Sequence, residues 1–595
     1  MRWLTAIAVL VLGAAAARAQ PAPSPPAPTL PTPTLPTPVQ PHPVLPDPVA
    51  YRLSPVMAGD KITALKVEIR FHEGPSGRSR LAWARTGEDD RLWRFARDVR
   101  IEGGEATADG PGAWVVHAAP GTPITASYRV VSAYGRDPTD DNSHQTWPVI
   151  RPDWFFALGE GLFATPEDHD KSPATFEWAG APRSLFGIGG FGFASDLEHL
   201  AGPGRKATRP GTVDDIQESV VIGGRDVRLI EKRVDNVRLR VAIVGRYNFA
   251  DKDFAAKVFE ILAAERAFWG EKAKPYLVAM SPTLSVGRRL SMNGRGRSDA
   301  FALWVDPASD QLDLRWLLAH EYFHTWNPVL LGSLPDGPTE PLGFWFSEGF
   351  TDYYAWKLML AAGQFGPADF AARWNETLAR YAISPLKAAP NTVVMTNFWV
   401  NQYAQKLPYY RGAILAATLD TQARAHGSSL DAVMREMRRM AAVKGETRHA
   451  AELFPAAYQA VTGIDPRPLI QRHMIDGEPI DLPRGALGAC FAVETVQVAA
   501  FDRGWDPDAT RAANMTLAGV KPGGPAYAAG LRDGMRLLEI IAAEPGDASH
   551  PYVLKVKPPG EADQVISYLP AGTGTVSRQT VTPVAAPGCP APPVS

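Results

Sequence analysis

Two histidines and a glutamate stand close together in the segment LLAHEYFHTW, residues 317–326. The segment has the apolar content of a buried helix, and residues i and i+4 of an α-helix lie about 40° apart on one face. His320 and His324 can therefore offer imidazole nitrogens to a single ion, with Glu321 just beside it. This spacing is typical of a catalytic zinc site.

A catalytic zinc ion usually takes three protein ligands and leaves one position for water. The offsets at which a metzincin would supply Gly and His hold Asn327 and Leu330, which excludes that subclass. A second apolar helix, FWFSEGFTDYYAWKLML, follows and offers Glu348 as an oxygen ligand. Asp352 lies one turn beyond Glu348 on the same face and suits acceptance of the free N–H of a zinc-bound histidine, with His320 as the expected donor. The alternative for both acids is a solvated surface position.

The elements that position these residues follow from the pattern of apolar residues. Residues 213–480 predict strands, then an amphipathic helix ending near Gly270, and a mostly helical half from about residue 312. Residues 49–212 alternate apolar and polar positions between Gly, Pro and Asp, which predicts a β-rich domain. The fold class is therefore multidomain α+β.

The N-terminus has the features of an export signal. Residues 1–19 carry an early positive charge, an apolar stretch too short to span a bilayer, and an A-x-A ending, so we expect cleavage before Gln20 and an exported protein without a transmembrane segment. Residues 20–48 are so rich in proline that they predict an extended tether. The formal net charge of -2, with no long basic run, argues against nucleic acid as a partner.

The sequence HEYFHTWN followed by FWFSEGFTDYY resembles the PDZ-containing glycyl aminopeptidase family of zinc metallopeptidases, metallopeptidase family 61. This family belongs to the gluzincins, in which a glutamate is the third zinc ligand. The resemblance implies a thermolysin-like catalytic domain over 213–480, a PDZ domain over 484–590, one zinc ion per chain, and peptides or proteins as substrates. It also implies that the strand DAFALWV borders the cleft, where an extended peptide could pair with its exposed edge. Zinc polarises a scissile carbonyl and acidifies water, and Glu321 is placed to act as the general base.

The tetrahedral intermediate of peptide hydrolysis also needs a donor for its oxyanion. The segment LPYYRGAIL resembles the tyrosine-x-basic-glycine segment of related gluzincin aminopeptidases, which implies this role for Tyr409. Its neighbour Tyr410 is the rival, and both could instead be core or rim aromatics.

One segment departs from the aminopeptidase pattern. Relatives hold the substrate ammonium with a glutamate before the edge strand, but residues 285–305, SVGRRLSMNGRGRSDAFALWV, contain none. The segment also contains four arginines: Arg288, Arg289, Arg295 and Arg297. Their positive charges would repel a substrate ammonium, unless they form only a solvated loop. Asp299 could take the place of the missing glutamate. The resemblance implies an aminopeptidase for small N-terminal residues, and endopeptidase activity is the alternative.

The last hundred residues resemble a bacterial PDZ domain. The amides of Leu487 and Gly488 could receive the carboxylate of a C-terminal peptide ligand, or the domain could be a structural cap. In an exported protein Cys490 and Cys589 predict a disulfide between the ends of this domain, although two free thiols are the alternative. A peptide-binding protein with a relic peptidase domain is the rival function.

Overall fold

The computed structural model describes residues 48–83, 91–140, 144–169, 172–180, 191–199, 211–286, 290–297, 299–544, 546–585 and 589. The predicted signal peptide and nearly all of the tether lie outside these ranges, as do Arg288 and Arg289. Within them, no helix combines the length and the apolar content that crossing a lipid bilayer requires.

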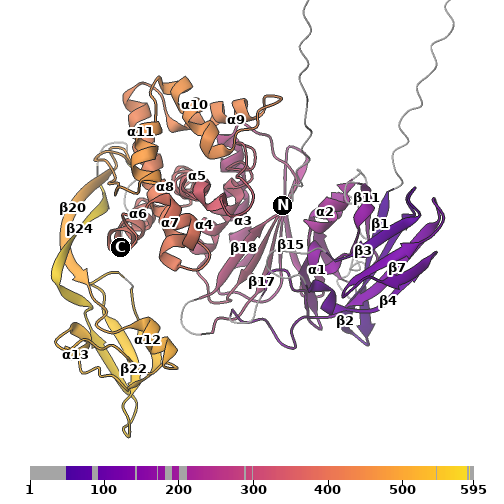
Figure 1. The fold of residues 1–595 in the computed structure, drawn as a ribbon, viewed down its shortest axis with the longest axis horizontal. Coiled ribbons are helices and arrows are strands. Elements are labelled where there is room, and N and C mark those ends of the chain that lie inside the picture. The colour runs from indigo at the N-terminus through magenta and orange to yellow at the C-terminus, as the bar shows by residue number, and fades with distance from the viewer. Residues whose placement is uncertain are drawn as a thin grey trace, which may run out of the picture. The chain divides into compact units, whose positions relative to one another are not determined.

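The N-terminal region is β-rich, as the alternating sequence predicts (Figure 1). In β2, for example, Val67, Ile69 and Phe71 are buried while the residues between them are more exposed. Three sheets have the orders β13-β11-β1-β2-β7-β4, β10-β3-β6-β5 and β12-β14-β9-β8. The elements are β1 (Val49–Ala58), β2 (Lys61–His72), β3 (Arg78–Ala82), β4 (Ala96–Glu102), β5 (Glu105–Ala108), β6 (Ala113–His117), β7 (Pro123–Val130), β8 (Val149–Ile150), β9 (Trp154–Leu158), α1 (Gly159–Leu162), β10 (Thr165–Pro166), β11 (Pro173–Trp178), β12 (Gly192–Ser195), β13 (Gly211–Thr212), α2 (Val213–Gln217) and β14 (Val220–Gly224).

The third sheet continues past the domain boundary expected at residue 212. Strand β14 pairs antiparallel with β9, and every residue of both strands is buried. Alternate residues face different cores: Phe155 and Val221 belong to the N-terminal core, whereas Phe156 and Ile222 pack with residues of the next sheet, such as Trp304. Burial on both faces explains why these strands are continuous apolar runs.

The catalytic region begins with a mixed five-stranded sheet of order β15-β16-β17-β19-β18. Strands β16, β17 and β19 are parallel, while β15 and β18 pair antiparallel at the two edges. The elements are β15 (Arg228–Val234), β16 (Val237–Ile243), α3 (Asp251–Phe268), β17 (Tyr276–Pro282), β18 (Met292–Gly296) and β19 (Ala300–Val305). The expectation that DAFALWV has an exposed edge was wrong, because this segment is the interior strand β19, paired with β17 and β18. The edge is β18, whose sequence MNGRG lacks the β-branched and aromatic residues that signal a strand.

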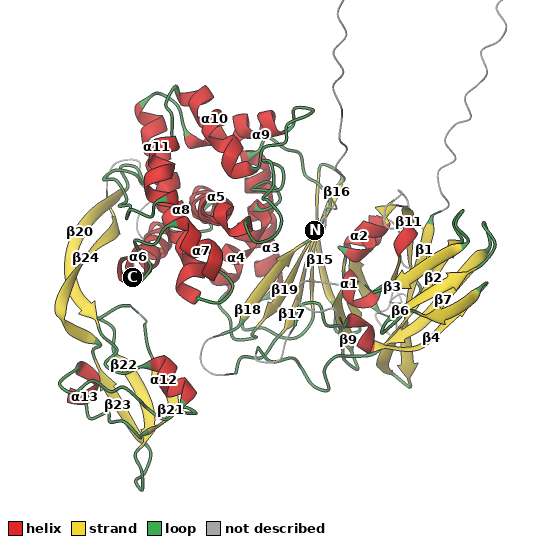
Figure 2. Cartoon of the chain, viewed as in Figure 1, coloured by secondary structure: helices red, strands yellow, loops and turns green. Residues whose placement is uncertain are grey.

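The rest of this region is helical (Figure 2). Helix α5 is buried almost all around, which explains its lack of a polar face. Its large aromatic residues form part of one core together with α4, α8 and α10. The helices are α4 (Gln311–Phe323), α5 (Phe344–Ala361), α6 (Pro367–Ile383), α7 (Asn391–Asn397), α8 (Gln402–Ala425), α9 (Leu430–Ala441), α10 (Ala450–Thr462) and α11 (Arg467–Ile470).

The C-terminal module is a long two-stranded ribbon, β20-β24, that leads to a small sheet, β21-β22-β23. The base of the ribbon docks on α6, where the side chain of Asn375 bonds both the N–H and the carbonyl of Val581, at 2.7 and 2.9 Å. Cys490 and Cys589 form a disulfide across this module, with their Cα atoms 5.4 Å apart. Its assignment as a PDZ domain stays a prediction. The elements are β20 (Phe491–Phe501), α12 (Pro507–Ala512), α13 (Pro525–Ala528), β21 (Arg536–Ala542), β22 (Tyr552–Lys557), β23 (Gln564–Tyr568) and β24 (Ala571–Pro583).

Candidate active site

Helix α4 presents the two histidines. Asp310 caps its N-terminus by accepting a hydrogen bond from the N–H of Leu312, and the helix ends at Phe323, with His324 as the C-cap residue. His320 and His324 stay one turn apart, and their Nε2 atoms are 3.2 Å apart. The spacing in the sequence is therefore realised as a pair of converging imidazoles.

Helix α5 brings Glu348 to the same point. Its Oε2 lies 3.4 Å from Nε2 of His320 and 3.6 Å from Nε2 of His324, while its Oε1 accepts a hydrogen bond from the hydroxyl of Ser347. Two ligands of a tetrahedral zinc ion, each at about 2.0–2.1 Å from it, are about 3.3 Å apart. The separations of 3.2, 3.4 and 3.6 Å therefore fit zinc, and the donor set of two imidazoles and a carboxylate is one that zinc accepts.

Both histidines are oriented by a partner on their other ring nitrogen. Nδ1 of His320 lies 2.9 Å from Oδ1 of Asp352, and Nδ1 of His324 lies 2.7 Å from the carbonyl oxygen of Asn327. A carboxylate and a carbonyl only accept hydrogen bonds, so each Nδ1 is a donor, and each Nε2 faces the other ligands, where a metal ion can displace its proton. Asp352 lies where the helix spacing predicts.

The same contacts set the charges of the ligands. Burial disfavours the charged form of His320, but hydrogen bonds to Asp352 and Glu348 outweigh it and raise its pKa to about 10. Burial alone would raise the pKa of Glu348, but the adjacent histidines, His324 foremost, hold it well below its usual range. Glu348 is therefore ionised, as a metal ligand must be.

Glu321 lies between the ligands in sequence and next to the edge strand in space. Burial raises its pKa, and the two histidines oppose that rise. A Cβ built at Gly296 of β18 would lie 4.0 Å from the carbonyl oxygen of Glu321. The backbone of Glu321 thus lies beside the edge strand, and its carboxyl has a raised pKa next to the two histidines.

Tyr409 on α8 lies against the ring of His320. The two rings are stacked with centroids 6.0 Å apart, and burial raises the pKa of Tyr409 well above its usual range. The phenol therefore keeps its proton and can donate a hydrogen bond. Tyr410 instead hydrogen-bonds Arg380 of α6, so the geometry favours Tyr409 for the donor role.

Two arginines of the segment 285–305 are paired with carboxylates, which the sequence did not predict. Arg297, whose side chain is 2% exposed, pairs with Glu160 of α1 and with Glu218, the latter at 2.6 Å. Arg295 lies 3.8 Å from the same Glu160. The two described arginines of this segment thus face carboxylates, which weakens their repulsion of a substrate ammonium. Asp299 lies near another acid, the buried Asp196.

The predicted carboxylate loop of the C-terminal module packs against the helical half. Leu487 is partly buried on the core of the catalytic region, and the amide of Gly488 donates to the carbonyl of Gly485 at 3.1 Å. Its role in binding a C-terminal peptide stays a prediction.

Other residues that build the site were not predicted from the sequence. The side-chain amide of Asn327 donates to the carbonyl of Phe346 and to the hydroxyl of Thr351, both at 3.1 Å, which ties the end of α4 to α5. Its place directly after the HEYFHTW segment was a clue to such a role. Glu160 and Glu218 lie so far from residue 297 in the sequence that only the fold could pair them with it.

Comparisons with known proteins agree with this geometry. The aminopeptidase N family protein from Idiomarina loihiensis has the same fold, with a TM-score of 0.65 and 16% identity over 90% of this chain and 98% of that chain. An M1 zinc metallopeptidase from Deinococcus radiodurans, at a TM-score of 0.43 and 16% identity over 74% of this chain and 96% of that chain, is too distant to carry an argument. None of the curated proteins matches the chain in sequence.

The family model of the M61 glycyl aminopeptidases matches residues 313–415, which contain the three ligands, Glu321 and Tyr409. The chain is a zinc metallopeptidase. In this peptidase the matched segment runs from α4 to the middle of α8, and so includes the helices that form both sides of the site.

Proposed function

We propose that this zinc metallopeptidase is an exported aminopeptidase that removes small N-terminal residues from peptides, with Glu321 as the general base and Tyr409 as the oxyanion donor. The observation that carries the proposal is the convergence of His320, His324 and Glu348 on one point, with the ring of Tyr409 stacked on that of His320. The features of residues 1–19 support export.

Each residue of the site has a separate role in peptide hydrolysis. A bound zinc ion supplies Lewis acidity, which polarises the scissile carbonyl and makes water easier to deprotonate. Glu321 takes the proton from the attacking water and passes it to the leaving amine. The hydroxyl of Tyr409 donates a hydrogen bond to the oxygen that gains negative charge, while Asp352 and the carbonyl of Asn327 hold the imidazoles in place.

The preference for a free N-terminus is supported by the paired arginines and by the glycyl aminopeptidase description of the matching family. The absence of a glutamate from residues 285–305 keeps endopeptidase activity as the alternative. We also infer that the C-terminal module captures the C-termini of protein substrates near Leu487 and Gly488.

A paired-substrate assay tests the specificity. The purified enzyme, loaded with zinc, is given peptides that begin with Gly, Ala or Leu, each with a free amine and in N-acetylated form, and products are identified by mass spectrometry. We expect release of a single N-terminal Gly or Ala from the free peptides alone. Equal cleavage of the acetylated peptides would rule out the exopeptidase and leave the endopeptidase.

A further inference from the structure

Tyr409 and the metal ligands come from helices that approach one another only through tertiary packing. The positioning of α8 against α5 therefore decides whether the phenol reaches the reacting atoms. The inference below rests on the proposed role of Tyr409 as oxyanion donor.

The two helices touch backbone to backbone at a pair of glycines. A Cβ built at Gly412 would lie 2.0 Å from the carbonyl oxygen of Trp345, and one built at Gly349 would lie 2.3 Å from the Cα of Gly412. Gly349 directly follows the ligand Glu348, and Gly412 lies one turn after Tyr409. This contact sets how closely the helices approach, but two glycines have no side chains that interlock and fix rotation or sliding.

A second contact lies further along the same face of α8. Tyr409, Gly412, Ala416 and Asp420 follow one another at offsets of three, four and four residues, which places them on one stripe. Eleven residues make just over three turns, so Asp420 lies about 16 Å from Tyr409 along the helix. Any rotation of α8 at Asp420 is therefore transmitted to Tyr409.

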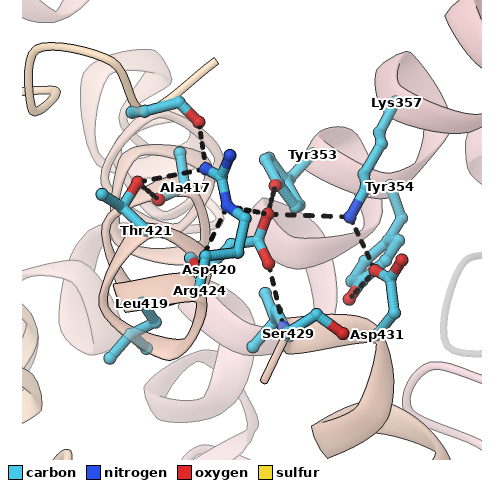
Figure 3. Close-up of polar contacts among 12 residues, drawn as sticks. Tyr353, Tyr354, Lys357, Ala417, Leu419, Asp420, Thr421, Arg424, Ser429 and Asp431 are labelled. Atoms are coloured by element: carbon cyan, nitrogen blue, oxygen red, sulfur yellow. Dashed lines mark hydrogen bonds and ion pairs between the residues drawn. The ribbon is translucent and has the colours of Figure 1, made fainter. Parts of the chain in front are cut away.

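Asp420 is buried, 4% exposed, and both of its carboxylate oxygens are engaged (Figure 3). Oδ2 accepts a hydrogen bond from the hydroxyl of Tyr353 at 2.7 Å, and Oδ1 accepts one from the N–H of Leu430 at 2.9 Å. Nζ of Lys357 and Nε of Arg424 lie 3.7 and 3.5 Å from Oδ2 and balance its charge. Buried charges with such partners are costly to disturb, so this contact has a defined geometry.

Tyr353 links this contact to the metal centre. It follows Asp352, the residue that holds His320, and lies on α5 in the turn after Glu348. We propose that Asp420 is a positioning residue for the reaction: by holding Tyr353 it fixes the register of α8 on α5 and thereby keeps Tyr409 over the metal site. Asp420 itself touches no reacting atom.

The test compares Asp420→Asn with Asp431→Asn in the full-length zinc enzyme. Asp431 bonds Tyr354 and Lys357 of the same helix α5, at 3.1 and 2.6 Å, but it belongs to α9 and is connected to α8 only indirectly, through Lys357. For Asp420→Asn we expect kcat to fall on the order of 10- to 100-fold, with KM and zinc content unchanged. For Asp431→Asn we expect a comparable loss of thermal stability with kcat unchanged.

Two further readouts separate positioning from simple loss of stability. In a Tyr409→Phe background, Asp420→Asn should lower kcat no further, because both changes remove the same interaction. Effects that multiply, or an unchanged kcat for Asp420→Asn, would overturn the proposal.

A crystal structure of the Asp420→Asn protein decides the matter even if the parent cleaves no peptide. The proposal predicts a displaced Tyr409 ring relative to His320, with the metal ligands in place. A Tyr409 ring in its parental position would refute it. An inactive parent would refute the proposed function alone.

Discussion

The two sides of this active site are assembled by different means. On the metal side, the 3.2 Å separation of the histidine nitrogens follows from one helical turn of α4, and Glu348 returns on the next helix. On the other side, Tyr409 depends on a glycine crossing and on distant side chains of α8. The two histidines of the metal side can be recognised from their spacing in the sequence. The position of Tyr409 depends instead on how α8 packs against α5.

The largest expected effect comes from breaking the metal side. Glu348→Ala removes one of three ligands, so we expect zinc to be lost on dialysis and peptidase activity to fall below detection. Elemental analysis and a peptide assay check this. Glu436→Ala, which removes an ion pair on α9, is the control and should retain both zinc and activity. Full zinc content in the Glu348 variant would mean that another group is the third ligand.

Removing the hydroxyl of Tyr409 should leave the zinc content unchanged. Tyr409→Phe is expected to lower kcat about 10²- to 10³-fold with zinc content unchanged, because only the hydrogen-bond donor is lost. The neighbouring Tyr410→Phe removes a hydroxyl that bonds Arg380 and should leave kcat nearly intact. The reverse pattern in steady-state kinetics would transfer the oxyanion role to Tyr410.

The glycine crossing tests whether packing alone controls this side. Gly412→Ala places a methyl group against the carbonyl of Trp345, which should cost about 1–3 kcal/mol of stability. The shift of α8 should lower kcat on the order of 10- to 100-fold. Gly366→Ala, at the start of α6, meets only the side chain of Asp369 at 3.4 Å and is the control. Thermal melts and kinetics equal to the parent would show that α8 tolerates the group and that the crossing is not critical.

The smallest effect is expected from a substitution that weakens the positioning of a zinc ligand without removing the ligand. Asp352→Asn weakens the hold on His320 and should reduce zinc affinity by about 10- to 100-fold, while saturating zinc restores most of the activity. Competition with a chelator measures this affinity. An unchanged affinity would reduce Asp352 to a packing residue.

The sequence predicts the metal side more fully than the rest. His320 and His324 are one turn apart on α4, Glu348 and Asp352 are one turn apart on α5, and the β-rich and helical regions follow from apolar periodicity. The edge strand β18 was missed because Gly294, Arg295 and Gly296 carry no strand signal. The pairing of Arg297 with Glu160 and Glu218, and that of Tyr353 with Asp420, joins residues far apart in the chain, and no local pattern encodes such pairs.

The most direct test of the account compares the purified mature protein with its Glu321→Ala variant. Both are analysed for zinc, and both are incubated with a mixture of peptides whose products are read by mass spectrometry. The account predicts one zinc ion per chain in both proteins and cleavage only in the parent. A parent without metal and without cleavage, even after zinc is added, would contradict it.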